Sequence, residues 1–218
     1  MPIFKNKNND FILFIHIPKS GGTSINTIIE RASHLHGISL TRGSLPVAPQ
    51  HFHAALLSQV GYADIAHGSF AITREPLNRL VSEYQYRCKN SPFIKKLFDF
   101  ETFARFSIDE YDNNSYILDN HIRPQNQFVL PDTKTYKYED GLFQAMEDIS
   151  GSFFVEVKGT IRHENRSPHI TVKLSQAGYQ KVLSFYADDY KRFGYLNPDT
   201  NIASSSVLFG LWCRAKAS

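Results

Sequence analysis

The feature that most constrains the fold is an apolar run from Phe11 to Ile17, followed at once by the glycine-containing loop Pro18–Ser24. Such a run is typical of a strand buried on both faces of a parallel sheet. After the loop, apolar residues recur at helical spacing, at Ile25, Ile28, Ile29 and Ala32. The order strand, loop, helix predicts the first half of a βαβ unit.

Later segments repeat this alternation of strands and helices. Strands are expected at residues 70–73, 135–138 and 153–157, helices at 54–60, from Pro76, at 142–149 and at 175–193, and a polar loop at 160–174. This order predicts a single α/β domain with a largely parallel sheet flanked by helices. We assign residues 1–200 to the domain and 201–218 to a C-terminal tail.

Composition excludes some classes of function. The 218 residues carry a formal net charge of +3, which is small for a nucleic-acid binder but suits a pocket that holds a few phosphates or sulfates. Two cysteines argue against a disulfide framework and favour a reducing compartment. Without a secretory signal or a run of ~20 apolar residues, we expect a cytoplasmic protein with no membrane span, for which peripheral membrane contact stays open.

The loop Pro18–Ser24 has the composition of an anion-binding loop. Gly21 and Gly22 let the backbone turn tightly, and the N–H groups of the following helical turn then face an anion. Lys19 adds a charge, and hydroxyl donors come from Ser20, Thr23 and Ser24. The lysine precedes the glycines, whereas a Walker A loop has it after them, which argues against an ordinary ATPase or GTPase.

A second anion site is indicated by Arg74 and Ser82. Arg74 follows the expected strand 70–73, at the sheet edge where open α/β folds bind ligands. Ser82 lies about two helical turns further on and returns to nearly the same helix face. An arginine fork and a serine hydroxyl suit a phosphate. The alternative is a surface arginine paired with Glu75 or Glu83.

Together, the two motifs resemble the sulfotransferases that use 3′-phosphoadenosine 5′-phosphosulfate (PAPS), especially the carbohydrate sulfotransferases of the heparan-sulfate 2-O- and chondroitin type and their bacterial relatives. The family's PK[TS]GGTS loop corresponds to Pro18–Ser24, and its R[DEN]PxxRxxSxY segment begins at Arg74. Weaker similarities lie at residues 121–125, 138–140, 163–167 and 189–195. The resemblance implies the sulfotransferase fold, which is similar to P-loop kinases in layout.

The resemblance also implies roles for individual residues. The first loop would hold the 5′-phosphosulfate, with Lys19 stabilising the leaving phosphate, and Arg74 with Ser82 would hold the 3′-phosphate. Asn165 and Ser167 are also expected to bind the nucleotide. The residues expected to contact the acceptor are His51, His121, Arg123 and Gln125. The expected general base is His53, with His51 as the next candidate, since histidine suits proton removal near neutral pH.

The function expected from these features is transfer of sulfonate from PAPS to a hydroxyl group of a carbohydrate or glycolipid. No metal is expected, because neither loop has beside it the set of carboxylates that a kinase or GTPase places for Mg²⁺. Two alternatives stay open, a nucleotide kinase with a divergent phosphate loop and a non-catalytic module that binds nucleotides or sulfated glycans. Neither the acceptor nor the oligomeric state follows from the sequence.

Overall fold

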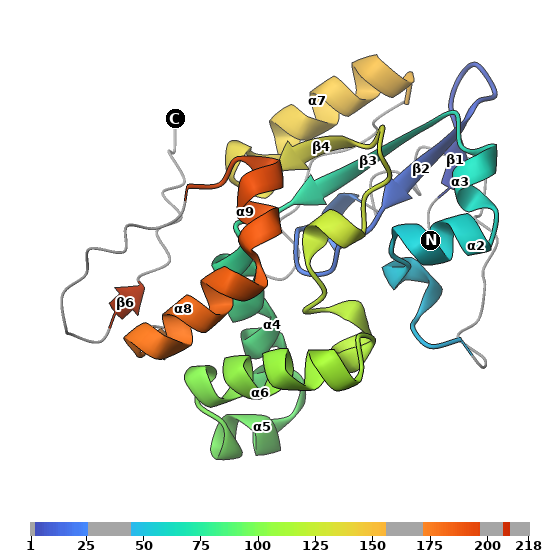
Figure 1. Ribbon diagram of the computed structural model, residues 1–218. Coiled ribbons are helices and arrows are strands. Elements are labelled where there is room, and N and C mark those ends of the chain that lie inside the picture. The colour runs from blue at the N-terminus through green and yellow to red at the C-terminus, as the bar shows by residue number, and fades with distance from the viewer. Residues whose placement is uncertain (1–2, 26–44, 156–171, 197–206, 210–218) are drawn as a thin grey trace.

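The computed structural model describes residues 3–25, 45–155, 172–196 and 207–209 (Figure 1). Its strands are β1 (Ile3–Lys5), β2 (Phe11–Ile15), β3 (Gly68–Thr73), β4 (Lys134–Lys137), β5 (Val172–Leu174) and β6 (Val207–Phe209). Its α-helices are α2 (Ala54–Gln59), α3 (Tyr62–Ile65), α4 (Pro76–Asn90), α5 (Pro92–Leu97), α6 (Phe100–Asn113), α7 (Leu142–Phe153), α8 (Gln176–Phe185) and α9 (Ala187–Phe193).

The central sheet has the order β1-β2-β3-β4. Strands β2, β3 and β4 are parallel, and β1 pairs antiparallel with β2 at the edge. Ile15 pairs with Ala71, and Thr73 pairs with Lys137, so the carboxyl ends of the parallel strands meet at one edge of the sheet. The expected α/β fold with a mostly parallel sheet is confirmed.

The alternation of side chains along β2 explains how the sheet is covered. Ile12 and Phe14 pack on one face with α7, and Leu13 and Ile15 pack on the other face with α2 and α3. In Figure 1, α7 accordingly runs along one face of the strands, opposite α2 and α3. Because both faces are covered, the strand is apolar throughout, as the sequence pattern predicts.

A second apolar cluster lies below the carboxyl edge of the sheet. It joins α4, α6, α8 and α9 through buried side chains that include Leu80, Phe103, Val182 and Tyr190. Figure 1 shows α4 leading away from the end of β3 into this group of helices. The site described below therefore lies where the sheet meets the helical cluster.

Several boundaries differ from the sequence expectations. The strand expected at residues 153–157 is wrong at its start, because α7 continues to Phe153 and Phe154 then closes it in the left-handed conformation, and residues 156–157 lie outside the described residues. The loop expected at 160–174 is wrong at its end, since residues 172–174 form β5, which pairs with β6, and the rest of it, residues 160–171, lies outside the described residues. The final helix breaks at Tyr186 into α8 and α9 and ends, as predicted, at Gly194.

The helix expected after the first loop is described only at its start. The helix predicted after the first loop begins at Gly22, but Ile28, Ile29 and Ala32 lie outside the described residues. Across the described part of the chain, no helix combines the length and apolar character that a membrane crossing requires.

Candidate active site

The first loop leaves the buried end of β2 and turns sharply. Lys19 and Gly21 both have positive φ, at 67° and 86°, and a helical turn begins at Gly22. The hydroxyl of Ser20 donates to the carbonyl oxygen of Ile17 at 2.6 Å, which fixes the turn from inside. The first helical N–H groups therefore start at the carboxyl edge of the sheet, where an anion would meet them.

The close approach of His16 explains why the loop needs glycine at position 22. A Cβ atom on Gly22 would lie 2.5 Å from Cδ2 of His16 and 2.6 Å from its Nε2. His16 itself is buried, and burial, followed by the charges of His51 and His121, lowers its pKa to about 3. His16 is therefore a neutral part of the wall behind the loop.

Arg74 joins the second motif to the first loop. Its Nη1 donates to the carbonyl oxygen of Lys19 at 3.1 Å, and its guanidinium lies 4.8 Å from the ring centroid of Tyr138. The ammonium of Lys19 lies 4.1 Å from the ring centroid of Tyr86. Among the described residues, neither cation has a carboxylate within ion-pair distance. The two motifs thus bring together two cations whose side chains, within the described part of the chain, contact aromatic rings and form no ion pair.

Burial and neighbouring charges both affect the pKa of Lys19. Burial is the main cause that lowers its pKa, Glu83 opposes the shift, and Arg74 and Arg87 add to it. A bound anion would relieve the repulsion among these cations, because opposite charge stabilises the charged form of lysine.

Gln125 holds the backbone of Arg74 in place. Its side-chain amide accepts from Arg74 N at 2.9 Å and donates to Arg74 O at 2.7 Å. Gln125 is fully buried, and its own N–H donates to Asp189 at 2.8 Å. The sequence analysis placed Gln125 on the acceptor side, but its amide is engaged with Arg74, so it positions the arginine.

Arg79 ties α4 to the first loop and to the segment at residues 121–123. It is 1% exposed, and its guanidinium donates to the carbonyl oxygens of Pro18, His121, Ile122 and Arg123 at 2.5 to 3.4 Å. One helical turn later, Ser82 is also buried on α4. Helix α4, which carries the second motif, is therefore held against the first loop.

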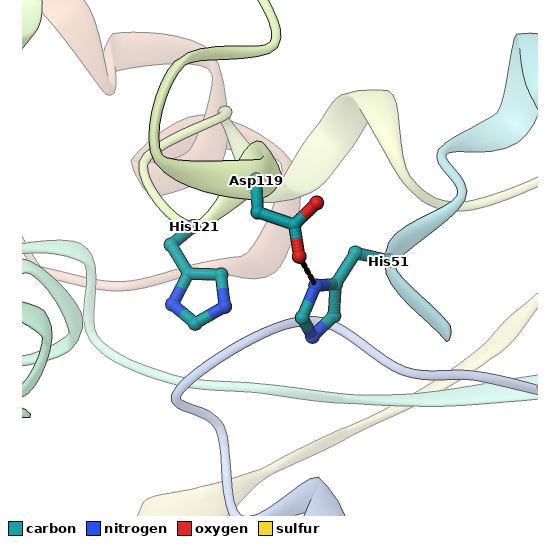
Figure 2. Close-up of side chains that lie close together, drawn as sticks. All are labelled: His51, Asp119 and His121. Carbon is teal, nitrogen blue, oxygen red and sulfur yellow. Dashed lines mark hydrogen bonds and ion pairs between the residues drawn. The ribbon is translucent and has the colours of Figure 1, made fainter. Parts of the chain in front are cut away.

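Two histidine–carboxylate pairs lie side by side next to the loop. Nδ1 of His51 lies 2.7 Å from a carboxylate oxygen of Asp119, and Nδ1 of His121 lies 2.6 Å from one of Glu83. The ring centroids of His51 and His121 are 4.7 Å apart, and those of His16 and His51 are 5.6 Å apart. Figure 2 shows the His51–Asp119 pair with the His121 ring beside it.

The partners of these histidines fix their tautomers. Burial opposes the charge of Glu83, but the hydrogen bond from His121 and the cation of Arg87 hold its pKa below the usual range. An ionised carboxylate only accepts, so Nδ1 of His121 carries the proton and Nε2 carries the lone pair. The same argument leaves the Nε2 lone pair of His51 available, since Nδ1 donates to Asp119.

A left-handed turn positions Asp119. Leu118, Asp119 and Asn120 have φ of 53°, 60° and 65°, which is unusual for three consecutive residues that are not glycine. Each such backbone conformation costs about 1–3 kcal/mol of folding free energy, and residues in such conformations cluster at functional sites. Asn120 is buried, donates to the carbonyl oxygen of His51 at 2.9 Å and accepts from Nε of Arg123 at 2.9 Å. The strained turn is thereby held against the segment that carries His51.

His53 has different surroundings from His51. Its Nδ1 lies 3.5 Å from Nδ2 of Asn120, and its ring lies 5.9 Å from that of Tyr116. Burial, and secondarily the charge of Arg123, lowers its pKa to about 4. His53 therefore lies against Asn120. His51 instead contacts His16, which borders the loop, and His121, which is paired with Glu83.

The expected site residues are only partly brought together. His121 lies beside His51, but Arg123 donates to Asn120, Gln127 and the carbonyl of Ser115, so its side chain stabilises the 115–127 segment. Asn165 and Ser167 lie outside the described residues.

Sequence reasoning missed Asp119, Asn120 and Tyr86, and it considered Glu83 only as an alternative partner of Arg74, not of His121. The one available signal was charge at a buried helix position, since Glu83 lies between Ser82 and Tyr84 in the second motif.

One protein-family model matches most of the chain. The family model described as "Sulfotransferase family" matches residues 3–196. No curated protein and no solved structure matches the chain.

Proposed function

The chain belongs to the sulfotransferase family, and we propose from this premise that it transfers the sulfonate group of PAPS to a hydroxyl group of a carbohydrate or glycolipid. The family supports sulfonate transfer in general. The donor and the residue roles rest on the site geometry together with the motif resemblance, and the acceptor class rests on the motif resemblance.

One observation carries the proposal, namely the pairing of Lys19 and Arg74. Their motifs come from different strands, yet the Arg74 guanidinium donates to the Lys19 carbonyl, and among the described residues neither side chain has an acidic partner. Two such cations beside a helical turn favour a ligand with more than one anionic group. PAPS has this character, since it carries phosphate at both ends of its adenosine.

The donor would be held by the two motifs. Backbone N–H groups after Pro18 and the hydroxyls of Thr23 and Ser24, with the ammonium of Lys19, would bind the 5′-phosphosulfate, and Arg74 with Ser82 would hold the 3′-phosphate. Ser20 would support this loop from inside, since its hydroxyl already donates to the carbonyl oxygen of Ile17. Asn165 and Ser167 remain proposed additions to this end of the nucleotide. PAPS supplies an activated sulfonate whose leaving group is a phosphate. Lys19 stabilises the charge that develops on this phosphate, a contact commonly worth about 10²–10³ in rate.

The contacts favour His51 over His53 as the general base. His51 has a carboxylate partner on Nδ1, which orients the ring and stabilises the imidazolium that forms. The pKa of His53 is lowered to about 4, so His53 is a weaker proton acceptor than an ordinary histidine. His51 also lies on the side of the cluster that borders the loop, through its contact with His16.

The proposed reaction balances with these residues alone. The acceptor oxygen forms a bond to sulfur while the bond from sulfur to the bridging phosphate oxygen breaks. The acceptor proton passes to Nε2 of His51, and adenosine 3′,5′-bisphosphate leaves with the electron pair. Asp119 keeps the ring in the required tautomer throughout.

Nucleotide selectivity tests the donor half of the proposal. Adenosine 3′,5′-bisphosphate should raise the melting temperature of the protein, and AMP should raise it much less, because AMP lacks the group that Arg74 and Ser82 hold. Equal stabilisation by both nucleotides would contradict the two-site assignment. Turnover of ATP with Mg²⁺ would instead indicate a kinase.

A further inference from the structure

We propose that His51, Asp119 and His121 form a binding site for a divalent transition-metal ion of the Zn²⁺ type. These three residues each offer a ligand atom, and the three atoms lie within 4.8 Å of one another. Two imidazoles and one carboxylate are a donor set that suits Zn²⁺ and its first-row neighbours. The ion would act as an inhibitor of the base rather than as a cofactor of the transfer.

The orientation of His121 supports the site. One ring nitrogen of His121 is turned toward His51 and Asp119, and the other is turned away (Figure 2). The nitrogen turned away is Nδ1, which is engaged with Glu83 at 2.6 Å, so the nitrogen facing the pair is Nε2. Histidines that ligate metals commonly have a carboxylate on their other nitrogen, which fixes the ring and raises its basicity.

Asp119 is held in place before any ion arrives. Its Oδ1 accepts from the backbone N–H of Ala48 at 2.8 Å, and its backbone lies in the left-handed turn at residues 118–120. Its side chain is 22% exposed, which leaves water and an ion a route to the carboxylate. A tetrahedral Zn²⁺ site needs ligand atoms ~3.3 Å apart, so the three atoms, which now lie within 4.8 Å of one another, would move closer together when the ion binds.

Charge balance also permits a dication. Asp119 and Glu83 contribute two negative charges next to the histidines, and Arg87 is the cation already paired with Glu83, at 2.5 Å. The positive charge of Lys19 disfavours a cation at this site and should weaken Zn²⁺ binding. An anion bound to Lys19 would offset that charge and strengthen Zn²⁺ binding.

Occupation by the ion would block catalysis, an effect that rests on the proposed function. An ion shared by Asp119 and Nδ1 of His51 would replace the proton that now joins them, and that proton would move to Nε2 of the same ring. With Nε2 protonated, His51 can no longer accept the proton of the acceptor hydroxyl. Trace zinc would then inhibit sulfonate transfer, and a chelator would reverse this inhibition.

Calorimetric titration of untagged, metal-stripped protein with ZnCl₂ tests the site directly. We expect one ion per chain, with the dissociation constant raised ~10-fold or more by His121→Asn and by Asp119→Asn. Asparagine is suited to position 119, because it tolerates the left-handed backbone found there. A thermal melt of each variant checks that it remains folded.

Two control variants separate this site from other zinc ligands in the chain. His67→Asn removes an exposed histidine whose ring accepts from Phe11 N, and Cys88→Ser removes a thiol. Both should bind Zn²⁺ as the wild type does. Absence of saturable binding by the wild type, or unchanged binding by folded His121→Asn and Asp119→Asn, would overturn the proposal.

Because this binding is measured without turnover, its failure overturns the metal site alone. Failure of the metal-free protein to transfer sulfonate would overturn the proposed function alone.

Discussion

At the residue scale, His51 and His53 illustrate how two histidines in one short segment acquire different chemistry. His51 has Asp119 on Nδ1 and the rings of His16 and His121 as neighbours. His53 has the amide of Asn120 and a desolvated setting near Arg123. A carboxylate partner strengthens a histidine as a base, and desolvation without such a partner weakens it.

This difference predicts the outcome of a matched pair of substitutions. His51→Asn should lower the rate of sulfonate transfer by about 10²–10⁴, because a general base is lost, and should leave the affinity for adenosine 3′,5′-bisphosphate close to that of the wild type. His53→Asn should lower the rate of sulfonate transfer by a smaller factor. Steady-state kinetics and nucleotide titrations measure both effects. A larger loss for His53→Asn would exchange the two roles.

Arg74 is the residue on which nucleotide affinity should depend most. Arg74→Ala should weaken binding of adenosine 3′,5′-bisphosphate by about 2–4 kcal/mol, because a partly buried phosphate loses its charged partner. Arg105→Ala is the control, since Arg105 is half exposed and lies 3.5 Å from Glu101. An unchanged dissociation constant for Arg74→Ala would remove this residue from the site.

At the scale of elements, the junction between β2 and the following helical turn depends on one close contact. His16 directly follows β2 and Gly22 begins the helical turn, and the ring of His16 occupies the space that a Cβ on Gly22 would need. Strand and helix can therefore come this close only with glycine at the junction.

Gly22→Ala should lower the free energy of unfolding by about 1–3 kcal/mol, because an added methyl group meets the His16 ring in a packed wall. The double variant His16→Ala with Gly22→Ala should lose less than the sum of the two single changes, by about 0.5–3 kcal/mol of coupling. Urea denaturation measures all three variants.

The matched control is Gly151→Ala in α7, where an added Cβ meets nothing within 4 Å. This change should leave stability unchanged or raise it by up to about 1 kcal/mol, since alanine is the better helix former. Strictly additive effects of His16→Ala and Gly22→Ala would contradict the close contact.

Elements whose pattern reflects burial were predictable, and elements set by tertiary contacts were not. The apolar run of β2 and the helix that starts at Pro76 followed from local rules. The aromatic and β-branched residues from Phe153 predicted a strand, but Phe153 instead ends α7 and packs on Phe70, with ring centroids 5.4 Å apart. Here the packing of a helix end overrode local propensity.

The same distinction holds within the site. Lys19 and Arg74 were recognisable because anion binding requires particular residues at the ends of parallel strands. Asp119 was not recognisable, because its position depends on a left-handed turn through Leu118 and Asn120, and the residue types in that turn do not specify the conformation.

At the scale of the whole molecule, the buried histidines make stability depend on pH. The pKa of His53 is about 4 in the folded protein, against 6.5 for an unperturbed histidine, so the unfolded chain binds a proton between these values and the folded chain does not. Stability therefore decreases as pH falls from about 6.5 to about 4.

His53→Gln removes this contribution, and its melting temperature should fall less than that of the wild type between pH 7 and pH 4.5. Because the other titrating groups are shared, the difference between the two proteins isolates His53. Thermal melts across this pH range measure it, and parallel curves would contradict the assignment.

Sulfonate transfer itself tests the central claim most directly. The protein is incubated with sulfur-labelled PAPS and a panel of polysaccharide and glycolipid fractions, and label is measured in the product together with release of adenosine 3′,5′-bisphosphate. The account predicts equal amounts of incorporated label and released nucleotide with the wild type, and loss of both with Lys19→Ala and His51→Asn. Transfer that persists in both variants would contradict the account.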